Sequence, residues 1–438
     1  MVNPLMRLAD GTVIQVGPLT GTQVWTIPGR SHRPLAGATA PRRALEADSP
    51  TGLCAFCSDR YLETTPEKAR LVRDTDGDGK GGVRIDRRRG ASHLHDDVAQ
   101  VRRFANLFEI VSAASWRINH GFIPSQDVHA WAASYLADPV GRAHVLDLTH
   151  ERAKAGGVLA PPPGNDGALL EATVDLLSGS HDVVVARRHL IDGAEFTDEL
   201  AGSGSLSPQE HAEFIDFTID GLREQYLAQP AARYVSVFQN WLRPAGASFE
   251  HLHKQLVGID SYGPQVLREI GMLRADPHTY SRAVLDLAVR ERLVVAANDG
   301  AVAIAGVGHR YPSLEVYSTA REQLPWEHSA SGRRAVSDLL HALHAATGAS
   351  VATNEEWHHR PPDVSEAMPW RIVLKWRLSI PAGFEGGTKI YVNTIDPWTL
   401  RERVCAELVN LRSAGLISPM AIGSEVTPES THLHYADA

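Results

Sequence analysis

Cysteine is scarce in this sequence, with three in 438 residues. Two of them form the pair Cys54-Ala55-Phe56-Cys57, and the third is Cys405. So few thiols, in a chain whose start carries no apolar secretory segment, exclude a disulfide framework and favour a reducing, cytoplasmic environment. We therefore expect the Cys-x-x-Cys pair to bind a metal or to act as a thiol pair, and Cys405 to be a small buried residue.

Long apolar runs and an excess of positive charge are also missing. No run approaches the roughly 18 apolar residues that a membrane span requires, which excludes a membrane partner. The formal net charge of −9 excludes a general nucleic-acid binder, because such proteins need a basic surface. Any phosphate site must therefore be local. With 43% apolar and 22% charged residues, the composition is that of a soluble globular protein.

The order of the expected elements indicates an α+β fold in two units. At about 150 residues per domain, the length suffices for two or three domains. Short strand-like segments and a few helices recur in each half, and residues 111–180 are predicted to be a mostly helical insertion. We place an N-terminal catalytic domain at residues 1–265 and a C-terminal domain at 266–438. Within the first, residues 207–210 (SPQE) form a capping box that begins a helix.

The segment at 246–256 carries the most informative set of side chains. In an extended strand alternate side chains point the same way, so that His251, His253 and Gln255 share one face. The loop at 246–248 (Gly-Ala-Ser) precedes them and could bring backbone N–H groups and a hydroxyl close to an anion. The opposite face takes Leu252, Lys254 and Leu256. Two imidazoles and an amide after such a loop predict a nucleotide-handling site.

Histidine suits phosphoryl chemistry because its neutral imidazole is abundant at pH 7 and can attack phosphorus without first losing a proton. A nucleophilic histidine gives a phosphoramidate that a second acceptor breaks, so that one difficult displacement becomes two easier ones. The tripeptide His-Leu-His occurs three times, at 93–95, 251–253 and 432–434. Only the middle copy follows a small-residue loop and precedes a glutamine, and it is therefore the candidate.

These residues resemble a known family. His251-Leu252-His253-Lys254-Gln255 is similar to the H-x-H-x-Q signature of the galactose-1-phosphate uridylyltransferases, the transferase branch of the histidine-triad superfamily. Five further segments resemble that family in the expected order: 18–34 (PLTGTQVW through PGRSHRP), 54–57 (CAFC), 101–108 (VRRFANLF), 181–189 (HDVVVARRH) and 386–394 (GGTKIYVNT). The resemblance implies two tandem histidine-triad (HIT)-like domains, each with an antiparallel sheet flanked by helices.

Roles follow from the resemblance position by position. It implies that His253 is the nucleophile, which attacks the α-phosphorus of a nucleoside diphosphate sugar. Gln255 would hydrogen-bond the phosphoryl oxygens of the nucleotidyl-histidine intermediate. The residues that the resemblance assigns to substrate binding are Arg30, Arg33, Asn106, Asn240, Gly246 and Ser248. An arginine fork suits phosphate oxygens in geometry as well as in charge.

The same resemblance implies one structural zinc ion per chain, held by Cys54, Cys57, His189 and His251. Two thiolates and two imidazoles make a closed tetrahedral set. His181 is the rival of His189 for the fourth position. The ion would fix the position of His253, two residues beyond its ligand, and would not act as a Lewis acid.

The predicted activity is transfer of a nucleoside monophosphate from a nucleoside diphosphate sugar to a phosphorylated acceptor, a sugar 1-phosphate. The expected partners are thus small molecules, the nucleotide sugar and the phosphorylated acceptor. The resemblance to the family further implies that the protein forms a homodimer. Two alternatives stay open. One is a nucleotide phosphorylase that uses inorganic phosphate on an ADP-sugar or a diadenosine polyphosphate. The other is a zinc-containing nucleotide-binding homologue without turnover.

Overall fold

The computed structural model describes residues 3–29, 43–45, 50–74, 82–156 and 164–437. At its centre is a sheet of 12 strands in the order β16-β10-β11-β12-β14-β13-β8-β9-β7-β6-β4-β5. Neighbouring strands in it pair antiparallel. The strands are β4 (Glu67–Arg73), β5 (Val83–Arg87), β6 (Ala99–Ala105), β7 (His181–Ala186), β8 (Tyr234–Trp241), β9 (His253–Ile259), β10 (Val294–Asn298), β11 (Ala301–Ala305), β12 (Ser313–Ser318), β13 (Thr353–His358), β14 (Arg371–Trp376) and β16 (Ala421–Ile422).

The sheet repeats one arrangement twice. In the first half β7, α5 (Pro208–Ala228), β8 and β9 follow one another along the chain, and β9 pairs with both β7 and β8. In the second half β12, α8 (Ala330–Thr347), β13 and β14 do the same, and β14 pairs with both β12 and β13. The halves join where β8 pairs with β13. This confirms the predicted α+β fold; the division into domains at 265/266 stays a prediction.

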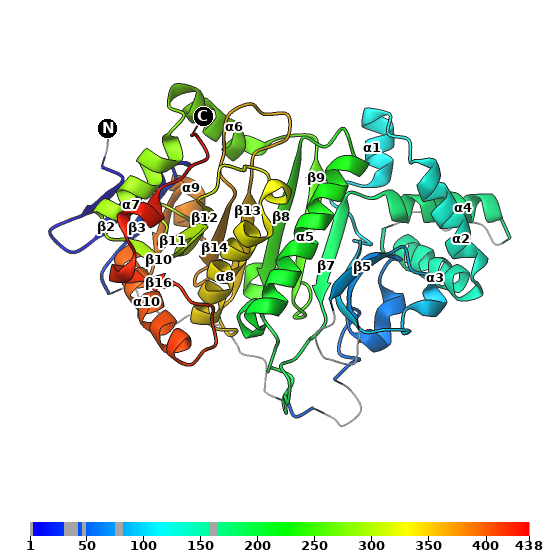
Figure 1. The fold of residues 1–438 in the computed structure, drawn as a ribbon. Coiled ribbons are helices and arrows are strands. Elements are labelled where there is room, and N and C mark those ends of the chain that lie inside the picture. The colour runs from blue at the N-terminus through cyan, green and yellow to red at the C-terminus, as the bar shows by residue number, and fades with distance from the viewer. Residues whose placement is uncertain (1–2, 30–42, 46–49, 75–81, 157–163, 438) are drawn as a thin grey trace.

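Helices α5 and α8 lie side by side across one face of the sheet (Figure 1). The capping box that the sequence predicts begins α5: Ser207 Oγ accepts from the Glu210 N–H, and the Glu210 carboxylate accepts from the Ser207 N–H. Ile215, Ile219 and Leu222 of α5 are buried, because they form the apolar stripe that faces the strands. The half-buried polar side chains of β8 and β9, among them Asn240 and Gln255, therefore lie on the opposite face of the sheet.

A buried ion pair links the two halves beneath these helices. Lys254 Nζ on β9 lies 2.5 Å from Glu355 Oε1 on β13, and both side chains are 0% exposed. Gln239 Oε1 also accepts from Lys254 Nζ, at 3.0 Å. His344 and Trp357 donate to the Glu355 carboxylate, at 2.8 and 2.6 Å. A charge at this depth is tolerated only because each of its polar atoms is paired.

Helices α1 (Ala113–His120), α2 (Gln126–Ala137), α3 (Pro139–Gly156) and α4 (Asp166–Ser178) form a bundle beyond β7 at one end of the sheet (Figure 1). They lie within the segment predicted to be a helical insertion. The remaining α-helices are α6 (Gly263–Ala275), α7 (Asp286–Arg290), α9 (Gly383–Thr388) and α10 (Pro397–Ser413). None of the helices in the described part of the chain has the length and apolar character needed to cross a bilayer.

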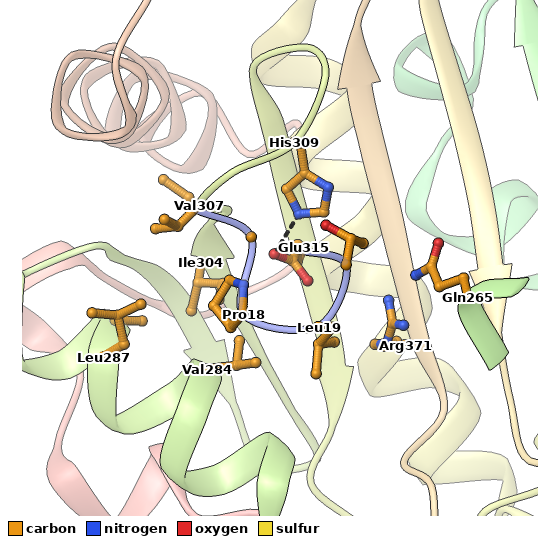
Figure 2. A pocket seen from close by; sticks show the side chains of 14 residues that line it. Pro18, Leu19, Gln265, Val284, Leu287, Ile304, Val307, His309, Glu315 and Arg371 are labelled. Atoms are coloured by element: carbon orange, nitrogen blue, oxygen red, sulfur yellow. Dashed lines mark hydrogen bonds and ion pairs between the residues drawn. The ribbon is translucent and has the colours of Figure 1, made fainter. Parts of the chain in front are cut away.

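The first strands pack against the second half of the chain. β1 (Leu5–Arg7), β2 (Val13–Val16) and β3 (Gln23–Thr26) form a sheet with β15 (Ile390–Asn393), which pairs parallel to β3. The loop after β2 lies over β11 and β12 near Glu315 and Arg371 (Figure 2). A Cβ on Gly308 would lie 2.0 Å from the backbone nitrogen of Gly17, so this approach requires glycine. The cavity beneath the loop, of about 20 Å³, has room for about one water molecule.

Candidate functional site

Four side chains from three distant segments meet beside β9. The Sγ atoms of Cys54 and Cys57 lie 3.8 Å apart. His189 Nδ1 lies 3.5 and 3.3 Å from these two sulfurs, and His251 Nδ1 lies 3.6 and 3.8 Å from them. All four ligand atoms fall within 4.8 Å of one another, so the set could hold a metal ion.

Hydrogen bonds aim His251 at this cluster. Its Nε2–H donates to the carbonyl oxygen of Ala186 at 2.7 Å, which leaves the Nδ1 lone pair directed at the sulfurs. Such an outer hydrogen bond fixes the tautomer of a metal-binding histidine. The hydrogen bond from the Cys54 thiol lowers the pKa of the Cys57 thiol, and the contacts with His189 and His251 lower it further. A lowered pKa favours the thiolate, which is the form of cysteine that binds metals.

His253 is the next residue on the same face as His251, and it is the first residue of β9. Its Nδ1–H donates to the carbonyl oxygen of His251 at 2.7 Å. Burial lowers the pKa of His253 to about 4, so the ring is neutral at pH 7 and Nε2 carries the lone pair. The ring is 4% exposed and packs edge-on against Phe56, at a centroid distance of 5.3 Å. The Phe249 ring lies 4.3 Å from the Phe56 ring, measured between centroids.

Gln255 is held by a residue whose role the sequence did not reveal. His181 Nδ1 accepts from the backbone N–H of Ile110 at 3.1 Å, so its proton is on Nε2. That Nε2–H donates to Gln255 Oε1 at 2.9 Å. With its oxygen engaged, the carboxamide keeps its NH₂ group as a donor. His181, the rival ligand, thus lies at the glutamine, and His189 lies in the cluster.

Two asparagines, Asn106 and Asn240, lie near His181 and His253. Asn106 Oδ1 accepts from the Phe108 N–H at 2.9 Å, which turns Nδ2 to within 3.3 Å of His181 Nε2. Asn240 Oδ1 accepts from Asn354 Nδ2 at 2.7 Å, which leaves the Asn240 NH₂ group as a donor. The pairing of Phe238 with Gln255, continued by two residues, places Asn240 opposite His253. Both asparagines are half-buried.

The loop before β9 lies next to Asn240. Gly246 has φ +90°, a left-handed conformation that glycine adopts without strain, and the Asn240 Nδ2 atom lies 3.9 Å from where its Cβ would be. Ser248 is exposed. Arg30 and Arg33 lie outside the described residues. The structure therefore brings the loop, Asn240 and the histidine strand together.

The alternation along β9 agrees with the pattern in the sequence. His253 and Gln255 face the site, whereas Leu252, Lys254 and Leu256 are completely buried toward the helices. Phe214 of α5 lies 5.1 Å from the Lys254 ammonium, which identifies that side as the helix face. The strand begins at His253, and His251 lies two residues before it with its side chain in the cluster.

Sequence reasoning missed His181 and Phe56 as neighbours of the site. Both occur in segments that were singled out for other reasons, His181 in the segment at 181–189 and Phe56 in the Cys-x-x-Cys segment. Pairing of Val183 with Gln255 brings His181 to the glutamine, and that register is a property of two strands more than 70 residues apart. The available signal in the sequence was His181 itself, a polar residue at the start of a strand that continues with Val183, Val184 and Val185.

Comparisons with known proteins agree with this architecture. The fold is similar to an ADP-glucose phosphorylase of Arabidopsis thaliana solved with bound ADP-glucose, at a TM-score of 0.56 and 16% identity, covering 90% of this chain and 97% of the other. It is also similar to a galT-like protein of Arabidopsis thaliana, at a TM-score of 0.54 and 16% identity over 89% and 97% of the two chains. At these identities the likeness is one of fold, and it agrees with the galactose-1-phosphate uridylyltransferase-like fold that the resemblance in the sequence implies.

No curated protein matches the sequence. One protein family does, over residues 8–435, a range that takes in every helix and strand described above except β1. The chain therefore belongs to the family described as "Domain of unknown function (DUF4921)".

Proposed function

We propose that this protein is a nucleotidyltransferase that moves a nucleoside monophosphate from a nucleoside diphosphate sugar to a phosphorylated acceptor through a covalent nucleotidyl-His253. The observation that carries the proposal is the hydrogen bond from His253 Nδ1–H to the His251 carbonyl oxygen, 2.7 Å long. It fixes a neutral ring with its Nε2 lone pair available. A neutral, oriented imidazole is what attack on phosphorus requires.

The reaction runs in two displacements. In the first, the Nε2–P bond forms as the bond from the α-phosphorus to the bridging oxygen breaks, and the sugar 1-phosphate leaves. In the second, a phosphate oxygen of the acceptor attacks the same phosphorus and the N–P bond breaks. The ring returns to its neutral form, and ping-pong kinetics follow.

Donors around His253 would stabilise the charge that develops on the phosphoryl oxygens. The bond from His181 to Oε1 leaves the Gln255 NH₂ group as a donor, and the bond from Asn354 to Oδ1 leaves the Asn240 NH₂ group as a donor. These amides and Asn106 are half-buried, so the substrate would approach from their side of the strand. Preorganised donors of this kind lower the barrier because they need not reorient during the reaction. Ser248, Gly246, Arg30 and Arg33 are proposed to bind the phosphates.

We assign the metal site to one structural zinc ion. With Zn–S of about 2.3 Å and Zn–N of about 2.0 Å, a tetrahedron has S···S edges of about 3.8 Å and S···N edges of about 3.5 Å. The cluster has an S···S distance of 3.8 Å and S···N distances from 3.3 to 3.8 Å. Zinc would join the Cys54 loop to the chain at His251 and so hold His253 in place.

Intact-mass measurement tests the proposal. The protein is incubated separately with UDP-, ADP- and GDP-glucose, beside His253→Ala and the exposed-residue control His150→Ala. We expect one nucleoside monophosphate to be added with one donor in the wild type and in the control, in an acid-labile, base-stable bond, and none in His253→Ala. An adduct that persists in His253→Ala contradicts the nucleophile. No adduct with any donor favours a binding protein without turnover.

A phosphorylase is the second candidate, since the chain shares its fold with an ADP-glucose phosphorylase. The two activities share the adduct and differ in the acceptor. The isolated adduct is therefore mixed with inorganic phosphate or with a hexose 1-phosphate. Release of a nucleoside diphosphate by phosphate alone identifies a phosphorylase, and formation of a nucleotide sugar identifies a transferase.

The proposal includes a cytoplasmic homodimer in which the second subunit helps to complete the acceptor site. It rests on the family analogy alone. Sedimentation of the full chain at micromolar concentration is expected to give twice the monomer mass.

A further inference from the structure

A second cavity lies on the other side of β7, between the bundle of α1–α4 and the end of α5. Its volume is about 770 Å³, within the range of small-molecule sites. Trp131 of α2 and Leu177 of α4 form its apolar wall, and Gln225 and Gln229 at the end of α5 form its polar wall. We call it the bundle pocket. Figure 1 shows the bundle of α1–α4 next to α5 and β7.

Several buried polar atoms that line the bundle pocket have no partner among the described protein atoms. Gln229 is 3% exposed, and neither atom of its carboxamide is hydrogen-bonded. Gln225 is 4% exposed and donates to the Leu256 carbonyl oxygen, but its Oε1 is unpaired. Trp131 Nε1 is likewise unpaired. An unmatched buried group costs about 1–3 kcal/mol, so two such glutamines side by side indicate a site that a ligand completes.

The charges around the pocket favour an anion. Four cations line it, Lys68, Arg87, Arg88 and Arg103, against the three carboxylates of Asp127, Asp182 and Glu224. Lys68 and Arg103 both face Asp182, and Arg87 pairs with Asp220 and Glu224. Within the part of the chain that the structure describes, no carboxylate pairs with Arg88. Its guanidinium lies 5.6 Å from the centre of the Trp131 ring.

We propose that the bundle pocket binds a nucleoside monophosphate or a ligand of the same chemistry, a planar ring with hydrogen-bonding edges joined to an anionic group. The two glutamines would pair with the donors and acceptors of the ring edge, since a carboxamide offers both. Trp131 would contact the ring face, and Arg88 would bind the phosphate as a fork. The inference does not rest on the reaction proposed for His253.

The pocket and the candidate active site lie back to back. Ser180 and Asp182 line the bundle pocket. The side chain of His181, between them in the chain, lies on the opposite face of the sheet and donates to Gln255. A ligand in the pocket would therefore contact both chain neighbours of the residue that orients the glutamine.

Ligand-induced change in the melting temperature tests the inference. AMP, UMP, GMP and inorganic phosphate, each at millimolar concentration, are added to the His253→Ala protein, to the same protein with Gln229→Leu, and to the same protein with Arg88→Ala. Arg290→Ala, an exposed arginine in the other half, is the matched control. We expect a rise of several degrees with at least one mononucleotide, kept in the Arg290 variant and lost in the other two.

Gln229→Leu also distinguishes a ligand site from a structural role. Because it replaces an unpaired buried amide by an apolar group of similar size, we expect the melting temperature without ligand to stay equal or to rise. The inference is overturned if no mononucleotide shifts the melting temperature, or if the shift is unchanged in Gln229→Leu and Arg88→Ala. An equal shift with inorganic phosphate overturns recognition of the ring.

Discussion

His181 and Gln255 share a hydrogen bond of 2.9 Å, from His181 Nε2 to Gln255 Oε1. It joins β7 to β9 on the face of the sheet that carries His253. The backbone N–H of Ile110 donates to His181 Nδ1, so the ring proton is on Nε2. The backbone before α1 thereby determines which ring nitrogen donates to Gln255. This chain of contacts makes His181 a positioning residue for the proposed chemistry.

Replacing His181 tests that role. In His181→Phe the ring volume is kept but the donor is lost, so the Gln255 carboxamide can rotate. A misplacement of this kind costs up to about 100-fold in rate, so we expect adduct formation to slow by about 10- to 100-fold with KM little changed. His181→Gln, which restores a donor, is expected to recover part of the rate.

A double-mutant cycle separates positioning from a general structural defect. If His181 acts only through Gln255, the variant with both His181→Phe and Gln255→Ala is as slow as Gln255→Ala alone. Rates that fall multiplicatively in the double variant would contradict positioning.

Metal content should depend on the cluster and not on thiols in general. We expect the purified protein to carry one zinc ion per chain and Cys57→Ala to carry none, because three remaining ligands leave the site incomplete. Cys405→Ala is the control, since that thiol lies in α10 and donates to the Val295 carbonyl oxygen at 3.4 Å. Elemental analysis by mass spectrometry measures both, and equal zinc loss in the two variants would contradict the assignment.

Breaking the ion pair between Lys254 and Glu355 should destabilise the fold. Lys254→Met leaves a buried carboxylate without its cation, and we expect a loss of about 3–5 kcal/mol in the free energy of unfolding, measured with urea. The double variant Lys254→Met, Glu355→Leu is expected to lose less than the sum of the single variants. Lys154→Met, in an exposed pair, serves as the control and should change little. A small effect of Lys254→Met would show that the pair is not what joins the halves.

Stability should fall in mild acid because of His359. Burial lowers its pKa to about 3, and Tyr226 OH donates to its Nε2 at 3.0 Å. Its unfolded pKa is about 6.5, so protonation favours the unfolded state. The stability that this residue contributes is complete above pH 6.5 and declines toward pH 3, by about 1.4 kcal/mol between pH 7.5 and 5.5.

The comparison uses urea unfolding at those two pH values. His359→Gln should lose about 1.4 kcal/mol less than the wild type between them, because one titrating group has been removed. The exposed residue His150, changed to glutamine, should leave the pH dependence as it is. Parallel pH profiles for wild type and His359→Gln would show that this ring is protonated in the folded protein.

The local features of this protein were determined by the sequence. The alternation of His253, Lys254 and Gln255 fixes which side chains face the site, because a strand has a period of two. The capping box at 207–210 begins α5 because its partners are three residues apart. Cys54 and Cys57 are likewise brought together by their spacing. Each of these features depends on neighbours in the chain.

Tertiary structure decided the rest. It placed His189 in the metal cluster and His181 at Gln255, it paired Lys254 with a carboxylate 101 residues away, and it set β1–β3 beside β15. The bundle pocket exists only where α2, α4 and α5 converge. None of this is visible in a local pattern, because the register between distant strands follows from how their apolar faces pack together and not from the period of either strand alone.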